Sequence, residues 1–460
     1  MCRWPLTDPQ HRSPGPMSRF LLASFLILPL NASAMGLLEV LELAEQHDAI
    51  YQAALADHRA VLAEQDIGES DMLPQLSFSA FARETRSTTT DSTSASSPNG
   101  DSDFGSRGYS LTLSQTLYDK QVFDSIDADQ ARSARAQLEL QAARQALVLR
   151  VAESYFALAS ARDSVRLAKA ETSAIGQQLE QAKERFDAGL IPITDVRESQ
   201  AQYDLAIANG FIAESELDNS REAIRTLIDT DVAQTVDISD DMPLLAPDPD
   251  DIESWQRQAM RGNLELLASG LALEAARLEV ESARGELYPV LSVDAEHSFS
   301  SSDGSTVSNA FSGRDLEQNS VTLNLTIPIY EGGGNRASVR QRVAEHDAAR
   351  ARHEQQQRLT MQSVRSAWLN VKASISRVKA LQQALASTRL ATEATRLSFE
   401  VGKRNSVDVL IAQREQYSSE NEYRRARYDY LLNTLRLEQA VGRLDSELIR
   451  QISAHMSGNG

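Results

Sequence analysis

An uninterrupted helical stretch constrains this chain more than any other feature. Residues 335–401 contain neither glycine nor proline and are rich in Ala, Gln, Arg and Leu. As a single helix this segment would be about 100 Å long at ~1.5 Å per residue, far longer than a helix of an ordinary globular domain. A second stretch, residues 119–188, is interrupted only by Gly176. Its apolar positions recur at the spacing of packed, coiled helices, as in Leu147, Val151, Tyr155 and Leu158.

The sequence also contains an internal duplication. Residues 185–196 match residues 398–409, and Phe, Gly, Asp and Val recur at a displacement of 213 positions, as from Phe186 to Phe399. Residues 73–76 recur as 288–291, and residues 117–118 as 329–330. Because self-similarity at a fixed period marks a repeated structural unit, we predict one unit present twice. The first copy spans 35–238, with a helix over 37–67, two strands within 73–118 and a helical hairpin with its tip near 186–196. The second copy spans 239–446, with a helix over 252–286, two strands within 288–330, a tip near 399–408 and a C-terminal tail over 447–460.

The return helices and the crossover complete this scheme. After each tip we expect a shorter helix, over 194–229 and 406–441, and residues 229–251 are expected to cross between the copies.

The predicted strands alternate between apolar and polar residues. Tyr109, Leu111 and Leu113 alternate with Ser and Thr, and the same period continues from Val321 to Ile329. Polar loops are expected over 88–107 and 300–319. The pattern fits a soluble sheet with one face on a core, or an outer-membrane barrel. Since the smallest barrel with a packed interior has ~8 strands, four strands would have to be shared with other copies of the chain.

The N-terminal segment has the pattern of a secretory signal. Residues 17–34 combine a basic start, an apolar run and the small residues Ala32-Ser33-Ala34, so cleavage is expected after Ala34 and translation is expected to start at Met17 rather than Met1. The one cysteine, Cys2, lies in this segment, and a mature chain would therefore carry no thiol. The formal charge of −19 argues against nucleic acid and favours a lumen or surface that attracts cations, although a solvated acidic surface explains the same number.

These features together resemble the TolC-like outer-membrane efflux and secretion channels along nearly the full mature length. The resemblance implies an α+β channel-tunnel built by a homotrimer, with a shared 12-stranded β-barrel in outer-membrane lipid and a 12-helix tube in the periplasm. It also implies two partners, a periplasmic adaptor protein and an inner-membrane transporter. The matching segments are 73–76, 185–190, 193–196, 201–204, 327–333, 407–410 and 426–433.

The sequence contains none of the catalytic or nucleotide-binding motifs that we sought. There is no P-loop, no GxGxxG, no CxxC and no GxSxG, and His353-Glu354 lacks the second histidine of a zinc peptidase. We therefore expect no enzyme activity, no cofactor and no metal site.

A gate is predicted at the two hairpin tips. Asp195 and Asp408 occupy equivalent positions of the two copies, and symmetry in an oligomer would turn each into an acidic ring that attracts cations. The alternative is helix capping, because acidic residues stabilise a helix N-terminus. Arg404 could bond to the Thr194-Asp195 region of the neighbouring hairpin. The resemblance places Asp195, Thr194 and Arg404 in the network that keeps the entrance closed. Phe399 stands where the family has Tyr, and Ile411 where it has a second Asp, so we expect one acidic ring beside an apolar one.

The turns themselves are predicted to dock the adaptor. Gly189-Leu190 and Gly402-Lys403 resemble the tip motifs against which adaptor hairpins pack, while a helix-terminating glycine explains the same residues. The predicted function is a passive exit duct for small molecules or secreted proteins, with efflux slightly favoured. An exported structural or adhesive coiled-coil fibre is the alternative.

Overall fold

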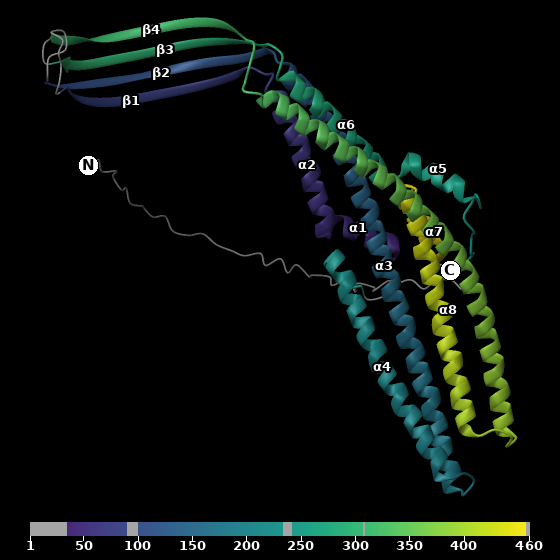
Figure 1. Cartoon of the computed structure of the whole chain (residues 1–460). Coiled ribbons are helices and arrows are strands. Elements are labelled where there is room, and N and C mark those ends of the chain that lie inside the picture. The colour runs from purple at the N-terminus through teal and green to yellow at the C-terminus, as the bar shows by residue number, and fades with distance from the viewer. Residues whose placement is uncertain (1–34, 90–99, 233–241, 307–308, 457–460) are drawn as a thin grey trace, which may run out of the picture.

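The computed structural model describes residues 35–89, 100–232, 242–306 and 309–456, and the predicted leader lies outside these ranges. A four-stranded sheet stands at one end, and long helices continue from it as a slender bundle (Figure 1). The expected α+β class is confirmed. The elements are α1 Leu37–His47, α2 Ala49–Ser70, β1 Gln75–Thr89, β2 Gly100–Tyr118, α3 Lys120–Asp187, α4 Ile193–Ile228, α5 Ile252–Gly262, α6 Leu264–Gly285, β3 Val290–Thr306, β4 Asn309–Thr326, α7 Gly334–Glu400, α8 Ser406–Ala440 and α9 Ser446–Met456.

The two long helices form as predicted. Helix α3 runs through Gly176 without a break, because this glycine serves a helix contact and not a turn. A Cβ at Gly176 would lie 3.1 Å from the Tyr203 ring of α4. The missing side chain therefore lets α3 and α4 approach closely.

The two shorter helices were each predicted as one piece, and that prediction is wrong. Asp48 separates α1 from α2, and Asn263 separates α5 from α6, at equivalent positions of the two copies. Both residues are extended and cap the following helix. The Asp48 carboxylate accepts from the Tyr51 amide at 2.7 Å, and the Oδ1 atom of the Asn263 side chain accepts from the Leu266 amide at 2.9 Å. The capping bond redirects the chain, so that α1 lies against α3 and α4, and α5 lies against α7 (Figure 1).

The sheet is larger than predicted. Its order is β1-β2-β3-β4, every pair is antiparallel, and most of the expected loops over 88–107 and 300–319 are strand. Ser, Thr, Asp and Gly extend the strands here because a backbone ladder needs no apolar side chain, and Arg86 joins Asp103 across it at 2.7 Å. In contrast, Ile327 and Ile329 lie beyond the end of β4. Pro328 between them has no amide to donate to a ladder.

The alternation of the strands is confirmed by the register. Leu76, Leu113, Ala295 and Val321 are paired across the four strands, and so share one face with the stacked rings of Phe78, Tyr109 and Phe299. Ser77, Thr112, Glu296 and Ser320 share the other face. The apolar face is not covered by the rest of the described chain, since Val321 is 78% exposed and Leu76 is 67% exposed. A sheet packed on its own soluble core is therefore not what this chain forms.

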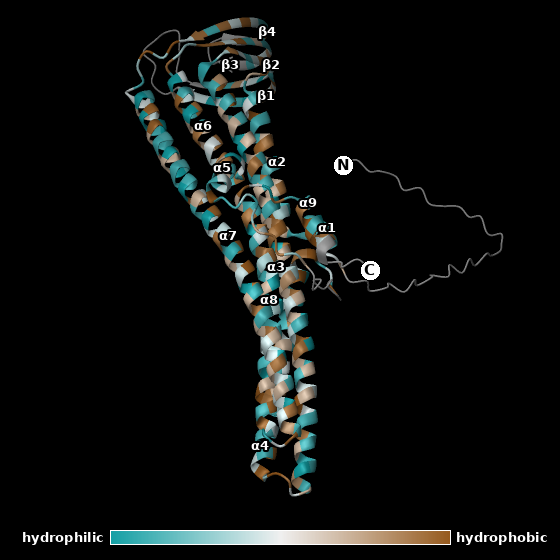
Figure 2. Cartoon of the chain, turned by 90° about the vertical axis from the view of Figure 1, so that its right-hand side faces the viewer, coloured by the Kyte–Doolittle hydropathy of each residue, from teal (hydrophilic) through white to brown (hydrophobic). Residues whose placement is uncertain are grey.

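The helices lie side by side in a defined order. Above the middle of the bundle the order is α2-α3-α6-α7, and below it the order is α4-α3-α8-α7. The main core fills the middle, where α1, α3, α5, α7 and α8 meet around Trp255, Tyr155 and Phe156. Within the expected tail over 447–460, residues 447–456 instead belong to α9, which buries Ile449 and Ile452 in this core. Figure 2 shows the hydrophobic residues distributed along the whole bundle rather than gathered in one apolar span. Within the described ranges, no helix has the length and apolar character needed to cross a membrane.

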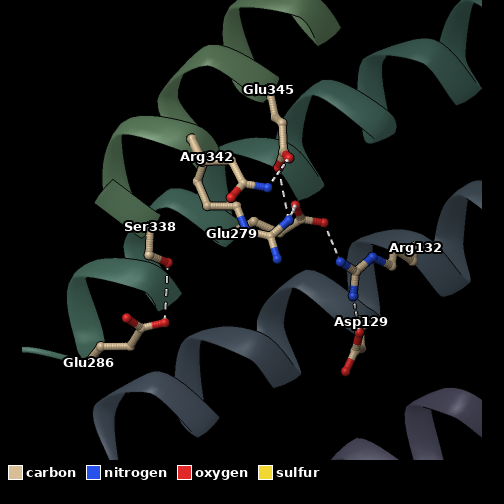
Figure 3. A network of polar contacts seen from close by, with 8 residues as sticks. Asp129, Arg132, Glu279, Glu286, Ser338, Arg342 and Glu345 are labelled. Carbon is tan, nitrogen blue, oxygen red and sulfur yellow. Dashed lines mark hydrogen bonds and ion pairs between the residues drawn. The ribbon is translucent and has the colours of Figure 1, made fainter. Parts of the chain in front are cut away.

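A network of ion pairs joins α3, α6 and α7 (Figure 3). Glu279 of α6 binds Arg132 of α3 with one carboxylate oxygen and Arg342 of α7, at 3.1 Å, with the other. Asp129 and Glu345 pair with the two arginines from the same helices that carry them. We call these five residues the collar. It fixes the helices where the sheet continues into the bundle.

Candidate functional site at the hairpin tips

Both hairpin tips end their long helix in the same way. At the first tip, Gly189 has φ of +70° and its amide bonds to the Phe186 carbonyl, while the Leu190 amide bonds to the Arg185 carbonyl. At the second tip, Gly402 has φ of +74° and makes the equivalent bonds with Lys403. These are Schellman motifs, in which glycine accepts a conformation that strains other residues. The helix-terminating role of the two glycines is thus confirmed.

The turns also leave an accessible surface. Leu190 is 73% exposed, and nothing lies within 4 Å of the position of a Cβ at Gly189 or Gly402. Lys403 is exposed beside Gly402. The predicted docking residues therefore stand free at the end of the bundle.

Asp408 acts as a helix cap. The Asn405 side chain accepts from the Asp408 amide at 2.8 Å, and the Asp408 carboxylate accepts from the Asn405 amide at 3.3 Å, which together make a capping box. Arg404 lies 3.6 Å from the same carboxylate. The second copy thus binds its acidic residue within its own turn.

Asp195 is arranged differently although it occupies the equivalent position. It lies in the first turn of α4 and receives a hydrogen bond from the Thr194 hydroxyl at 3.3 Å. The N-cap of this helix is Pro192, which makes no side-chain bond to the helix. The Asp195 carboxylate therefore retains more acceptor capacity than that of Asp408. The predicted bond from Arg404 to Thr194 or Asp195 does not form within this one chain, because Arg404 faces Asp408 of its own hairpin.

Phe399 joins the two hairpins. It is buried at 8% exposure, and the Arg185 guanidinium lies 4.2 Å from the centre of its ring. Arg185 belongs to the last turn of α3, whereas Phe399 belongs to the last turn of α7. We did not single out Arg185 for this role from the sequence. The signal was present, because the two copies differ at this position: Arg185 precedes Phe186, whereas Ser398 precedes Phe399.

Near the tips, the two hairpins meet through one small cluster of buried residues in the described part of the chain. Ile175, Ala206 and Leu410 pack together from α3, α4 and α8. Close by, Glu171 of α3 is half-buried, and this burial raises the pKa of its carboxyl while the nearby Arg414 of α8 opposes the shift. Burial also raises the pKa of the Tyr417 phenol, to which the charge of Glu171 contributes. The contact between α3 and α8 therefore contains a carboxyl that is less stable in its charged form.

Several polar side chains near the tips are buried without a partner. The oxygens of Gln178 and Ser199 in the first hairpin, and of Ser406 and Gln413 in the second, make no hydrogen bond in the described structure. A buried polar atom without a partner costs roughly 1 to 3 kcal/mol. Burial of these atoms accordingly lowers the stability of the helix packing near the tips.

The described residues contain no group of three or more His, Cys, Asp or Glu placed to hold a metal ion. The arrangement at the tips can instead attract cations through carboxylates and hold hairpins together through ion pairs and a cation–π contact.

Comparison with known proteins defines the class. The sequence pattern of the family described as "Outer membrane efflux protein" matches residues 40–230 and 255–443, and the chain belongs to this family. Among its relatives, "Outer membrane protein TolC" of Vibrio cholerae serotype O1 is 31% identical over 92% of this chain and 94% of its own. "Alkaline protease secretion protein AprF" of Pseudomonas aeruginosa is 28% identical over 94% of this chain and 90% of its own. In fold, the chain is similar to the Campylobacter jejuni CmeC outer membrane channel, with a TM-score of 0.74 at 17% identity over 92% of this chain and 90% of that one.

This membership confirms the predicted class. The protein is a TolC-like outer-membrane channel that serves as an exit duct in efflux or type I secretion. Its family consists of passive channels and not of enzymes. The relatives give no support to the fibre alternative.

Proposed function

We propose that three copies of this chain close into one continuous duct, with a shared barrel of twelve strands above a tube of twelve helices. The sheet supports this because it is open: β1 and β4 are its edges, and neither pairs with a further strand among the described residues. Unpaired edges and an exposed apolar face of this size call for another chain and for lipid. Three sheets of four strands also exceed the ~8 strands that a barrel with a packed interior needs.

The helices support the same closure independently. One flank of the bundle is α7 along its whole length, and the other is α2 above and α4 below. β1 follows α2, and β4 precedes α7, so the sheet and the helices present the same two flanks in the same order. A contact between the α7 flank of one copy and the α2/α4 flank of the next repeats head to tail. Such a contact gives a closed ring when the rotation closes.

The duct is passive and takes its cargo from partners. We propose that the exposed turns at Gly189-Leu190 and Gly402-Lys403 dock a periplasmic adaptor, which connects the tube to an inner-membrane transporter. The cargo class is small molecules or secreted proteins. Relatives carry both kinds of name, as in the "Outer membrane efflux protein BepC" of Brucella suis and the alkaline protease secretion protein AprF.

The entrance is gated at the tips. Asp195 is the proposed ring residue, because its carboxylate is not consumed by helix capping, whereas Asp408 and Arg404 hold the turn of the second hairpin. Thr194 supports the Asp195 carboxylate. In the ring Arg404 also faces the Thr194-Asp195 pair of the neighbouring chain. Ile411, which is 46% exposed, contributes an apolar surface beside the acidic one, while Phe399 packs between the hairpins.

Single-channel recording of the purified protein in a planar bilayer tests this proposal. We expect small steady openings that are blocked by divalent cations added on the tip side. Asp195→Ala should weaken the block and raise the conductance, and Arg404→Ser should raise the conductance. Asp218→Asn, in the same helix but paired with Arg221 away from the tip, is the matched control and should change neither quantity. A folded oligomer that never conducts would contradict the duct.

A further inference from the structure

Helix α2 is poorly covered by its own chain. It spans 22 residues, and none of them is buried in the described structure. Its main contact is α3, while Ile67 is 66% exposed and Leu62 is 40% exposed. Because helices in proteins gain most of their stability from tertiary packing, a helix at the edge of a layer with so little cover calls for a partner on its free face.

The free face of α2 carries two opposite charges. Gly68 marks the face that packs on α3, because a Cβ at this position would lie 2.6 Å from the Asp129 carboxylate. At about 100° per residue, Arg59 points roughly 180° and Asp66 roughly 160° away from Gly68. Both side chains are exposed, and Asp66 forms no ion pair with any residue that the structure describes. From the sheet toward the tips, this face is therefore negative and then positive.

The free face of α7 carries the same charges in the opposite order. Arg342 marks the face toward α6, through its ion pair with Glu279. Arg340, Asp347 and Glu354 point roughly 120° to 160° away from Arg342 by the same helical geometry. All three are exposed, and Arg340 has no ion-pair partner within the described ranges. From the sheet toward the tips, this face is positive at Arg340 and then negative.

The collar relates the heights of the two helices along the bundle. Gly68 of α2 stands beside Asp129, which belongs to the same network of ion pairs as Arg342 of α7 (Figure 3). Helix α2 runs toward the sheet, whereas α7 runs away from it. The nine residues from Gly68 down to Arg59 therefore correspond to the nine residues from Arg342 down to position 351.

This relation places opposite charges at matching heights. Arg59 stands at a height between those of Asp347 and Glu354. Asp66 stands about one helical turn from the height of Arg340, within the reach of an arginine side chain. In a ring, symmetry gives every copy the same heights, so these charges meet where the α7 flank of one copy touches the α2 flank of the next.

We propose that neighbouring copies recognise each other through these charges, with Asp66 of one copy beside Arg340 of the next, and Arg59 beside Asp347 and Glu354 of the next. The inference rests on the proposed function in one respect, namely that the α7 flank of one copy meets the α2 flank of another. It adds the chemistry by which the chain selects its partner.

The same charges oppose the wrong contact. Copies in one membrane point in the same direction, so a two-fold contact between two α7 flanks would set Arg340 against Arg340. A two-fold contact between two α2 flanks would set Asp66 against Asp66. Like charges that face each other across an interface are unfavourable. The pattern therefore selects the head-to-tail contact that repeats into a ring over a closed dimer.

Exchange of the charges tests this pairing in the protein purified in detergent. Asp66→Arg and Arg340→Asp each set like charges against each other, and the double variant restores opposite charges. Analytical ultracentrifugation measures the dissociation of the oligomer. Each single variant should raise the dissociation constant by roughly twofold to thirtyfold per junction, the effect of reversing an exposed ion pair. The double variant should recover most of this loss, since the two sites are coupled.

Two further measurements sharpen the result. The difference between the single variants and the starting protein should shrink at high salt, because exposed charges are screened. Arg277→Glu is the matched control. It reverses an exposed charge of α6 and breaks only the pair with Glu274 of the same helix, so it should leave the dissociation unchanged.

The outcomes separate the charge pairing from the duct. Single variants that dissociate like the starting protein, in an oligomer that conducts, overturn the pairing and leave the duct in place. A double variant that dissociates as readily as the single ones also overturns the pairing. Recovery in the double variant of an oligomer that never conducts supports the pairing and overturns the duct instead.

Discussion

The middle of the bundle and the hairpin tips are built from the same helices but are held together in different ways. In the middle, side chains from α1, α3, α4, α5, α7, α8 and α9 form one large core that buries Trp255, Tyr155 and Phe156 almost completely. At the tips the buried clusters contain three residues each, and several polar oxygens have no partner. The difference indicates where this chain can open locally. The free energy of local opening is lowest where few apolar contacts must be broken.

The largest expected effect is in the middle core. Phe156→Ala should lower the free energy of unfolding by about 3 to 5 kcal/mol, because it empties a site that packs against Tyr155 and Tyr428. Denaturant unfolding followed by circular dichroism measures this. Leu410→Ala, at an equally buried site near the tips, should leave the midpoint of unfolding much closer to that of the starting protein and should instead speed hydrogen exchange in α8. Equal losses at the two sites would remove the distinction between the regions.

Disruption of the collar should have the second largest effect on stability. Glu279→Gln leaves Arg132 and Arg342 without their shared partner, and we expect a loss of about 1 to 2 kcal/mol in the same unfolding measurement, since both arginines are partly exposed and screened. Glu281→Gln in the same helix, which breaks only the exposed pair with Arg284, should cost less than about 0.5 kcal/mol. If the two variants cost the same, the collar has no special role in holding the three helices.

Gly402→Ala tests the turn at the second tip. A Cβ has free space there, so the expected cost of about 1 kcal/mol comes from the left-handed backbone alone. We expect faster hydrogen exchange in the last turn of α7 and no change in the middle core. Gly210→Ala is the control, because it also has open space but lies within α4 and should be neutral or stabilising. A Gly402→Ala protein with unaltered exchange at the tip would contradict the strain.

The smallest expected effect depends on pH. The pKa of Glu171 is raised above its ordinary value of 4.5 by burial, so the packed hairpins bind its proton more readily than the unfolded chain does. Its charged form therefore opposes packing at neutral pH, and this cost disappears as the pH falls through the raised value. Glu171→Gln should protect α3 and α8 from hydrogen exchange at pH 7 by a few tenths of a kcal/mol, a figure that allows for screening of a half-exposed group. The advantage should vanish below about pH 4.5, where both side chains are neutral. An advantage that persists at low pH would assign the effect to packing instead.

Much of the fold could be predicted from the sequence. The long helices were predictable because they contain no proline and only one glycine each, Gly176 within α3 and Gly334 at the start of α7. The alternation of Leu113 and Val321 with polar neighbours assigned the two faces of the sheet. The duplication predicted equivalent tips. The breaks at Asp48 and Asn263 were missed because Asp and Asn also occur within helices. Whether such a residue caps a new helix depends on how the flanking segments pack. The strand extensions were missed because segments rich in Ser, Thr and Gly are typical of loops. Their strand conformation depends on pairing with a neighbouring strand, which the sequence pattern does not indicate.

The position of the hairpin tips was predictable, but the bonding of the candidate gate residues was not. The sequence by itself determined the helix ends, since Gly189 and Gly402 terminate α3 and α7 by backbone chemistry that depends on neighbouring residues only. It also determined that two carboxylates would stand at equivalent positions. Only the tertiary structure decided that Asp408 joins a capping box beside Arg404 whereas Asp195 receives a hydrogen bond from Thr194, and that Arg185 meets Phe399 across more than two hundred residues of chain. Local backbone preferences depend on the residues of a short segment. A contact between distant segments forms only when two helices pack in one particular register.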